Sequence, residues 1–475
     1  MDVYDLVFSG IDGATGRRLD DPTTTDELGD LILGGQFDGR LITELAHHGE
    51  PHFGVAEGAF PERLDDVGWA VVGSEDTPDE VIAALRPLLD LRRDQAGDRY
   101  HEFLGADGLR RRDRTRRFLQ RHGVGLGMPV NPDRVPYYLL LVGGPGSIPF
   151  EHQYELAAGY AVGRLDFDRP ADYQRYAERV LAAESARPTA RPSIDLFGPS
   201  HPDDPATQLS AELLVDELHT LLESRLGEQS VSRLPSTSAT KDALLDLLGE
   251  CSDLLVAACH GLAFPPTDDL QLAQQGALLC QDWPGPAAWT GRLATEFFVS
   301  ADDARKLPSI ETKVMLASAC FSAGTPQTDG FPRRRDERAR VIAARPFVAS
   351  LPKQLLAHPG GGALGFIGHV DRTWGSSFRM PDGQPQVDVY DSVARAVANG
   401  SRLGHASRYF ALRHQAVGVA LTTLLDEIRQ NGLVADRAEL SRLWLETNDA
   451  RGVVVLGDPA VRVRPSSEAP EAKGA

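Results

Sequence analysis

His260 and Cys320 are the residues whose types and positions in this sequence suggest nucleophilic chemistry. The apolar run DLLVAAC (253–259) leads directly into His260, and the apolar run VMLASAC (314–320) ends in Cys320. A thiol nucleophile needs a base that takes or shares its proton and later protonates the leaving amine, and an imidazole suits both steps. If the two runs are parallel strands of one sheet, their ends lie at the same edge, where open α/β folds place their sites. The pattern therefore predicts a His–Cys pair at one edge of a sheet.

Gly261, directly after the histidine, adds a second catalytic element to this prediction. A residue without a Cβ lets a substrate approach closely, and the backbone N–H groups of Gly261 and Cys320 would together hold a tetrahedral oxyanion. The structural alternative is a turn or core role, because a single histidine or a single buried cysteine most often has no catalytic function.

The other three cysteines are weaker candidates for a functional thiol. Cys251 precedes the expected strand, and Cys280 lies in a Gln-rich segment without an adjacent base. Cys259 is expected to point to the face opposite His260, because neighbouring residues of a strand alternate. We therefore assign the functional thiol to Cys320.

The elements that would position these residues are those of an α/β protein. Short apolar runs, most of which end in a small residue, alternate with longer segments whose apolar residues lie three and four positions apart. The expected strands are 69–73, 137–143, 194–198, 253–259, 314–320, 363–368 and 453–457. The expected helices are 78–92, 170–185, 206–226, 240–249, 391–399 and 403–431. Such alternation is typical of a buried parallel sheet covered by helices.

The length of 475 residues allows two or three domains. The segment SARPTARPS (185–193) has two prolines and no apolar periodicity, so we place a domain junction there. The predicted units are an N-terminal α/β subdomain (1–186), a larger catalytic domain (190–465) and a disordered polar tail (466–475).

Composition excludes several classes of partner. Lys and Arg number 49 against 68 Asp and Glu, and the formal charge of −19 repels phosphate backbones and anionic membranes, so we expect neither nucleic acid nor a membrane as a partner. Four cysteines without paired spacing indicate neither a disulfide scaffold nor a zinc site, and we expect no metal and no cofactor. No signal peptide and no membrane-spanning run is recognisable, which predicts a cytoplasmic protein with reduced thiols.

Around these residues the sequence resembles the caspase-like cysteine peptidases, and more specifically their CHAT and gingipain-like branches. The runs 253–261 and 314–324 look like the His-Gly and Ala-Cys strand ends of that superfamily, and 137–150, 160–167 and 457–459 are similar to segments of gingipain-like catalytic regions. The resemblance implies two side-by-side caspase-like three-layer α/β/α subdomains with mainly parallel sheets, of which the second is catalytic. It also implies a cysteine endopeptidase with a His-Cys dyad.

The sequence departs from two motifs of the superfamily. The caspase pattern Gln-Ala-Cys-x-Gly is replaced by SACFS (318–322), so caspase-type specificity for Asp is not carried over. Ser322 and Gly324 fit the CHAT pattern with Ala323 as an extra residue between them. No Asp or Asn that would orient the histidine is identifiable from the sequence.

Asp371 and Trp374, in GFIGHVDRTWG (365–375), are the candidate specificity residues. Asp371 stands where separase-like and CHAT members carry an acidic residue that binds a substrate Arg or Lys, and a carboxylate pairs bidentately with a guanidinium. The resemblance therefore implies cleavage after Arg or Lys, with Trp374 as a pocket wall that stacks on the arginine. The alternatives are that Asp371 pairs with Arg372 or solvates a turn, and that Trp374 belongs to the core.

The segment 325–345 is polar, rich in arginine and typical of an exposed loop leading into a helix. In caspases the loop at this position is cut when the enzyme matures. Self-cleavage at Arg335, Arg338 or Arg340 is therefore a hypothesis, and an ordinary solvated loop is the alternative.

The resemblance implies a protein substrate and a regulatory protein partner. Bacterial CHAT-like peptidases often serve defence systems, so a gasdermin-like or other effector encoded nearby is a candidate substrate. The alternative from another functional class is a catalytically silent caspase-like scaffold or binding protein, because a fold does not prove a function.

Overall fold

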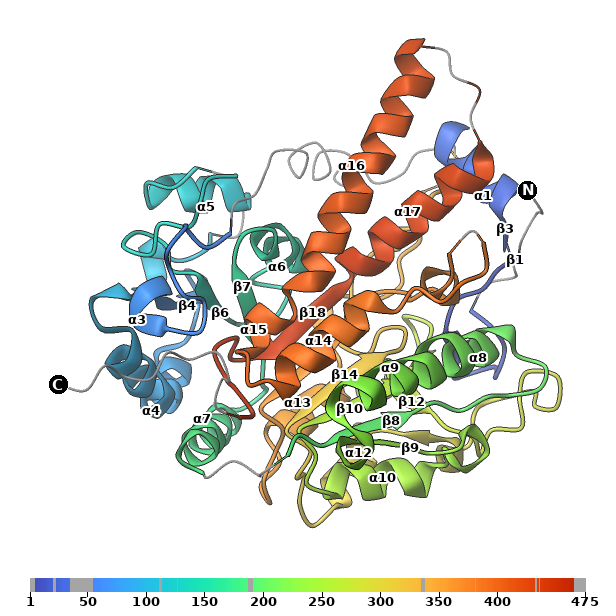
Figure 1. Ribbon diagram of the computed structural model, residues 1–475, viewed down its shortest axis with the longest axis horizontal. Coiled ribbons are helices and arrows are strands. Elements are labelled where there is room, and N and C mark those ends of the chain that lie inside the picture. The colour runs from blue at the N-terminus through green and yellow to red at the C-terminus, as the bar shows by residue number, and fades with distance from the viewer. Residues whose placement is uncertain are drawn as a thin grey trace.

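The computed structural model describes residues 5–19, 23–34, 54–110, 113–125, 127–186, 191–334, 338–380, 382–431, 434 and 436–464. Their centre is one ten-stranded sheet with the strand order β5-β4-β6-β7-β18-β17-β14-β10-β8-β9 (Figure 1). The strands are β4 (Trp69–Gly73), β5 (Tyr100–Phe103), β6 (Tyr138–Val142), β7 (Ala161–Leu165), β8 (Ile194–Phe197), β9 (Val231–Arg233), β10 (Leu254–Ala258), β14 (Val314–Ser318), β17 (Gly365–His369) and β18 (Val453–Gly457). All seven predicted strands are among them.

Neighbouring strands of this sheet are parallel except for β17 and β18, which are antiparallel. The sheet therefore consists of two parallel halves that run in opposite directions and meet at this pair. β10 and β14 are neighbours in the second half, with Ala258 opposite Ser318. The predicted α/β class with a mainly parallel sheet is confirmed, and the two strands expected to carry the site end side by side.

The two units predicted from the sequence contribute strands to this one sheet, and their division at 186/190 stays a prediction. Residues 187–190 of the predicted junction and the predicted tail 466–475 lie outside the described residues.

Helices cover the sheet on both faces (Figure 1). On one side α4 packs against α7 and α12 against α13, and on the other α14 contacts both α9 and α16. The helices are α1 (Thr25–Gly34), α3 (Leu64–Val67), α4 (Asp79–Ala96), α5 (Thr115–Arg121), α6 (Phe150–Ala157), α7 (Pro170–Ser185), α8 (Pro205–Leu209), α9 (Glu217–Leu226), α10 (Lys241–Gly249), α11 (Gln271–Gln274), α12 (Ala301–Lys306), α13 (Ser350–Leu356), α14 (Asp388–Ala398), α15 (Leu403–Ala406), α16 (Arg408–Asn431) and α17 (Arg437–Arg451). The result is a sheet buried between helical layers, as its uninterrupted apolar strands require.

The first described residues pack against the second half of the chain. β2 (Gly10–Asp12) is the edge of a small sheet with β11 (Gly261–Ala263), β12 (Leu278–Leu279) and β13 (Phe298–Val299). β2 runs parallel to β11, the strand that follows His260. α1 lies beside α17, near the N-terminus in Figure 1. The N-terminal segment is thereby brought to the strand edge that carries the candidate site.

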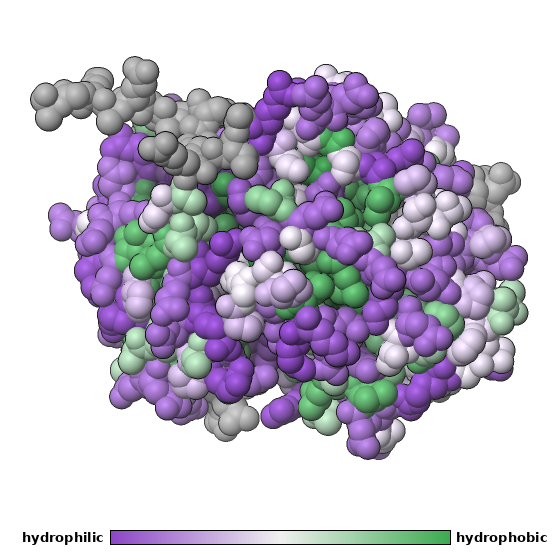
Figure 2. Space-filling view, turned by 90° about the horizontal axis from the view of Figure 1, so that it is seen from below, coloured by the Kyte–Doolittle hydropathy of each residue, from purple (hydrophilic) through white to green (hydrophobic). Residues whose placement is uncertain are grey.

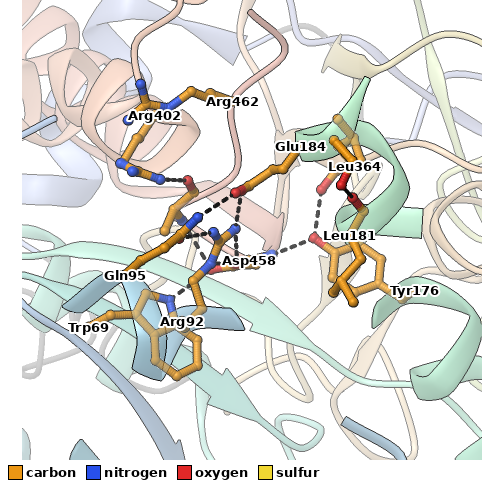
Figure 3. Close-up of polar contacts among 12 residues, drawn as sticks. Trp69, Arg92, Gln95, Tyr176, Leu181, Glu184, Leu364, Arg402, Asp458 and Arg462 are labelled. Carbon is orange, nitrogen blue, oxygen red and sulfur yellow. Dashed lines mark hydrogen bonds and ion pairs between the residues drawn. The ribbon is translucent and has the colours of Figure 1, made fainter. Parts of the chain in front are cut away.

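A buried ionic cluster ties the end of the last strand, β18, to β4, α4 and α7 (Figure 3). Asp458 follows β18 and accepts hydrogen bonds from Trp69 Nε1 at 2.9 Å and from Arg92 Nε at 2.7 Å. Arg92 also pairs with Glu184 of α7 at 2.6 Å. Buried charges are costly unless they are paired, so this cluster holds the elements that supply its partners together.

The face shown in Figure 2 is mostly hydrophilic, with small separate hydrophobic patches. Within the described part of the chain, no helix combines the length and the apolar character needed to cross a membrane. The described residues also contain no group of three His, Cys, Asp or Glu side chains arranged to hold a metal ion.

Candidate active site

His260 and Cys320 follow the neighbouring strands β10 and β14, and both are completely buried. The strand pairing continues beyond the ends of β10 and β14, because the N–H of Cys259 donates to the carbonyl of Ser318 at 3.3 Å. Gly261 lies directly against the backbone of Cys320, since a Cβ added there would stand 1.8 Å from the Cys320 carbonyl oxygen. No side chain fits at this position, which gives a steric reason for the glycine after His260.

Asp204 binds His260 and was not identified in the sequence. Its Oδ2 accepts the hydrogen bond of His260 Nε2 and that of Thr207 Oγ1, the latter at 3.0 Å. Burial opposes the charge on Asp204, but the charge and hydrogen bond of His260 outweigh it and hold the pKa of the carboxyl below its usual range. The signal in the sequence was an acidic residue shortly after β8, whose carboxyl end lies at the same edge of the sheet.

This contact determines which nitrogen of His260 is available for proton transfer. A carboxylate oxygen only accepts, so Nε2 carries a proton and Nδ1 holds the lone pair of the neutral ring. Nδ1 is buried and has no hydrogen-bond partner among the described residues. The ring packs edge-on against Trp283 at 6.1 Å between centroids. An oriented imidazole with one unpaired nitrogen is suited to act as a base.

The thiol of Cys320 is held by the loop after β17. Its Sγ accepts the N–H of Thr373 at 3.2 Å. Asp449 of α17 positions this loop, because its Oδ1 accepts Thr373 Oγ1 at 2.8 Å and the N–H of Trp374 at 3.0 Å. Burial raises the pKa of the thiol, although the Thr373 N–H and the charge of Arg372 act in the opposite direction. In the state described here the thiol is therefore protonated at neutral pH.

The two N–H groups expected to hold an oxyanion converge on one oxygen. The N–H of Gly261 donates to the Ser9 carbonyl at 3.2 Å, and the N–H of Cys320 donates to the same oxygen at 3.3 Å. An oxyanion hole requires such convergence of preorganised donors on a single acceptor.

Two strained residues flank the same site. Phe321 has φ 58° and Asp371 has φ 85°, and they are the only described residues other than glycine with positive φ. They are adjacent, because the N–H of Phe321 donates to the Asp371 carbonyl at 2.8 Å. Such conformations are costly for residues with a side chain and cluster at functional sites.

Asp371 and Trp374 line a cavity of about 410 Å³ beside this loop. The Arg372 guanidinium makes a bidentate ion pair with Asp329, at 2.7 and 2.9 Å, and also pairs with Asp371 at 3.4 Å. The backbone N–H of Arg372 donates to Asp371 Oδ1 at 2.9 Å. The Asp371 side chain remains 27% exposed. Burial raises the pKa of Asp371 to about 6, opposed by Arg372 and assisted by Asp329. Asp371 thus keeps accessible carboxylate surface although Arg372 is nearby.

Two roles were considered for Trp374, a pocket wall and a core residue, and both apply. It is 4% exposed, and its ring packs between Phe8, at 5.1 Å, and Phe331, at 5.7 Å. The tryptophan therefore belongs to a hydrophobic cluster and also forms part of the cavity wall.

The arginine-rich loop is partly described. Arg338 and Arg340 are exposed, and Arg335 lies outside the described residues. Within its described part, Thr328 and Val341 form an antiparallel bridge, and the chain then continues through β16 (Phe347–Val348) into α13. The exposure of Arg338 and Arg340 is compatible with proteolysis and equally with an ordinary solvated loop.

A second buried histidine lies close to a second cysteine. The ring of His201 contacts the backbone of Cys280 and packs against Trp283 at 5.0 Å. The Cys280 thiol donates instead to the Leu278 carbonyl at 3.4 Å. The contact of this pair is thus between the His201 ring and the Cys280 backbone.

No protein-family model matches the sequence, and no curated protein matches it. Among solved structures, the fold is similar to one described only as a protease, with 11% identity, a TM-score of 0.48, and coverage of 84% of this chain and 79% of the other. It is also similar to the Porphyromonas gingivalis complex of RgpB pro- and mature domains (13% identity, TM-score 0.46, 84% and 80% coverage). A third similar structure is the Arg-specific cysteine proteinase gingipain R (13% identity, TM-score 0.44, 87% and 80% coverage).

These similarities concern the fold alone. The roles of individual residues in this chain rest on the contacts described above.

Proposed function

We propose that this protein is a cysteine endopeptidase of the caspase-like kind, related to the CHAT and gingipain-like branches. The observation that carries the proposal is the Ser9 carbonyl, which the N–H groups of Gly261 and Cys320 both bind. A peptide carbonyl thus occupies the place where the carbonyl of a scissile bond must lie, next to the thiol. Cys320 is the nucleophile, His260 the acid and base, and Asp204 the residue that orients the imidazole.

The reaction follows from these positions. His260 Nδ1 takes the thiol proton, and the thiolate attacks the carbonyl carbon of the substrate. The two N–H groups stabilise the oxyanion while Asp204 stabilises the imidazolium through Nε2. The C–N bond breaks as His260 gives its proton to the leaving amine. Water, deprotonated by His260, then hydrolyses the thioester and regenerates the thiol.

Specificity for Arg or Lys is proposed from Asp371 and the cavity that it lines. A guanidinium pairs more favourably with a carboxylate that is partly withdrawn from water than with one on the surface. Trp374 would form a wall beside it. A panel of peptides that differ only in the residue before the scissile bond tests this: preference for an acidic or an apolar residue would contradict the proposal.

The biological partners are proposed from the sequence resemblance. The substrate would be a protein, for example a gasdermin-like or other effector encoded nearby, and the setting a bacterial defence system with a regulatory protein partner. Proteins cleaved in a lysate by the active enzyme but not by Cys320→Ala would identify the substrate. Intact mass of active enzyme tests self-cleavage after Arg335, Arg338 or Arg340.

The catalytically silent scaffold remains the second candidate, because Cys320 is completely buried in this structure. A chloromethylketone probe that carries arginine separates the two functions. The probe is applied to protein whose Cys320 reacts with iodoacetamide. There the peptidase requires labelling at Cys320 that is lost in His260→Ala, whereas a scaffold would leave the thiol unlabelled.

A further inference from the structure

The N-terminal segment Leu6–Asp12 lies across the candidate active site. Its first part pairs with the loop that holds Cys320: the N–H of Ser9 donates to the Thr373 carbonyl at 3.0 Å, and the N–H of Gly375 donates to the Val7 carbonyl at 3.1 Å. Phe8 and Trp374 form an antiparallel bridge between these two hydrogen bonds. Residues 7–9 are therefore paired with the backbone of 373–375 like an added strand, which is a common way to bind an extended peptide.

Beyond Ser9 the segment pairs with the other side of the site. Gly10, Ile11 and Asp12 are opposite Gly261, Leu262 and Ala263 in a parallel register. The Ser9–Gly10 peptide thus has backbone pairing on both sides at the point where the segment passes Cys320. A Cβ added to Gly10 would lie 3.3 Å from Cys320 Sγ, so the segment itself covers the thiol.

We propose that Leu6–Asp12 is an intramolecular inhibitory segment that occupies the substrate cleft as a bound peptide would and keeps the enzyme latent. This inference rests on the proposed function and extends it to regulation. A protein substrate takes the same path, along Thr373–Gly375 and then along Gly261–Ala263, once the segment has left. Latency is relieved by displacement of the segment.

The identity of Ser9, whose carbonyl accepts the N–H groups of Gly261 and Cys320, explains why the segment blocks the site. Ser9 occupies the position that precedes a scissile bond, and its hydroxymethyl group offers no cation to Asp371. The segment therefore gains the backbone contacts of a substrate without the side-chain contact proposed for specificity. The covered thiol also stays protonated, because burial raises the pKa of Cys320.

Two further contacts hold the segment in place. The Phe8 ring packs on Trp374, and the guanidinium of Arg372 lies 5.5 Å from its centroid. Arg18, opposite Ile11 on the returning chain, lies 3.5 Å from Asp204 Oδ1 and donates to the Asp203 carbonyl at 3.2 Å. Leu6–Asp12 thereby covers the thiol, and Arg18, which pairs with Ile11 of this segment, contacts the residue that binds His260.

The alkylation rate of Cys320 tests this occupancy in the full chain without requiring catalysis. The double variant Phe8→Ala/Ser9→Pro removes the ring that packs on Trp374 and the N–H donated to Thr373. We expect iodoacetamide to alkylate Cys320 about 10- to 100-fold faster than in the parent protein. The matched control is Ile32→Ala on α1, which weakens the same hydrophobic cluster outside Leu6–Asp12 and should leave the rate near that of the parent.

Hydrolysis of an arginyl peptide by the same proteins separates the two proposals. Latency predicts low activity of the parent and a matching rise in the double variant, lost on Cys320→Ala. Equal alkylation of the parent and the double variant, or full activity of the parent, overturns the inhibitory segment and leaves the peptidase untouched. Faster alkylation without hydrolysis by any variant overturns the peptidase instead and leaves the occlusion of the thiol established.

Discussion

Two buried aspartates, Asp458 and Asp204, follow strands of the same sheet, and they differ in the side chains that bind them. Asp458 binds a guanidinium and an indole: Oδ2 accepts from Arg92, and Oδ1 accepts from Trp69 and from the N–H of Ala460. Asp204 binds an imidazole and a hydroxyl, those of His260 and Thr207. Both carboxylates are fully withdrawn from water.

The partner determines what each cluster can do. Burial opposes the charge on Arg92, but Asp458 and Glu184 outweigh it and raise the pKa of the guanidinium, so the cluster keeps its protons. The Nδ1 of His260, in contrast, has no hydrogen-bond partner within the described residues. We call the Asp458 cluster closed, because its ionic groups pair with one another, and the Asp204–His260 pair open. The closed cluster joins the end of β18 to β4, α4 and α7 within one half of the sheet. An Asp→Asn substitution should therefore lower stability at Asp458 and activity at Asp204.

The largest effect is expected for Cys320→Ala, at the strand edge that also carries Asp204 and His260. Removal of the nucleophile should lower kcat/KM by about 10⁴-fold or more, because only binding and the oxyanion donors remain. Thermal unfolding should change little, since a methyl group replaces a buried thiol. Hydrolysis of arginyl peptides by the activated chain measures this, and activity near the parent level would exclude Cys320 from the mechanism.

Asp204→Asn should lower kcat by about 10²- to 10⁴-fold, because the neutral amide no longer stabilises the imidazolium or fixes its tautomer. KM should change much less, since Asp204 is not placed to touch the substrate. A variant that raises KM and leaves kcat unchanged would show that Asp204 serves binding and not the orientation of His260.

Asp458→Asn is the matched substitution in the closed cluster. It leaves Arg92 buried with only Glu184 to balance its charge, and breaking a buried ion pair costs about 3–5 kcal/mol of unfolding free energy. Urea unfolding measures this loss. The kcat per folded molecule should remain that of the parent, and a selective loss of kcat without loss of stability would contradict the division between the two clusters.

The smallest effect concerns pH and Asp371. Because burial raises the pKa of this carboxyl to about 6, it is ionised at pH 7.5 and largely neutral at pH 5. The ratio of kcat/KM for an arginyl peptide to that for its uncharged counterpart should fall about tenfold between these pH values. A change in rate that is common to both peptides cancels in the ratio. Asp371→Asn should give a ratio that is low and independent of pH.

Local pattern was sufficient to locate the seven predicted strands and the two strand ends that carry His260 and Cys320. The reason is that an uninterrupted apolar run reflects burial of its own residues, and parallel strands bring their ends to one edge. Helix bounds were less accurate: the expected helix 206–226 is divided into α8, a π-helical turn (Ser210–Asp216) and α9. Helix α17, which carries Asp449, was not expected at all.

Asp204, Asp449 and the N-terminal segment could not be found in this way, because their roles depend on contacts far apart in the sequence. Asp204 is an ordinary acidic residue of a loop until β8 is placed beside β10. Ser9 and Gly10 carry no chemical signal of their own. Their position at Cys320 depends on the pairing of β2 with β11 and of Phe8 with Trp374.

The sequence by itself determined the fold class, the nucleophile and base proposed here, and the glycine between their strands, because each depends on residue type and local burial. Only the tertiary structure decided which acid orients His260 and which oxygen the N–H groups of Gly261 and Cys320 bind. It also decided that Ser9 and Gly10 lie beside Cys320. Backbone hydrogen bonds are the same for every residue type, so a segment bound through its backbone leaves almost no trace in the sequence.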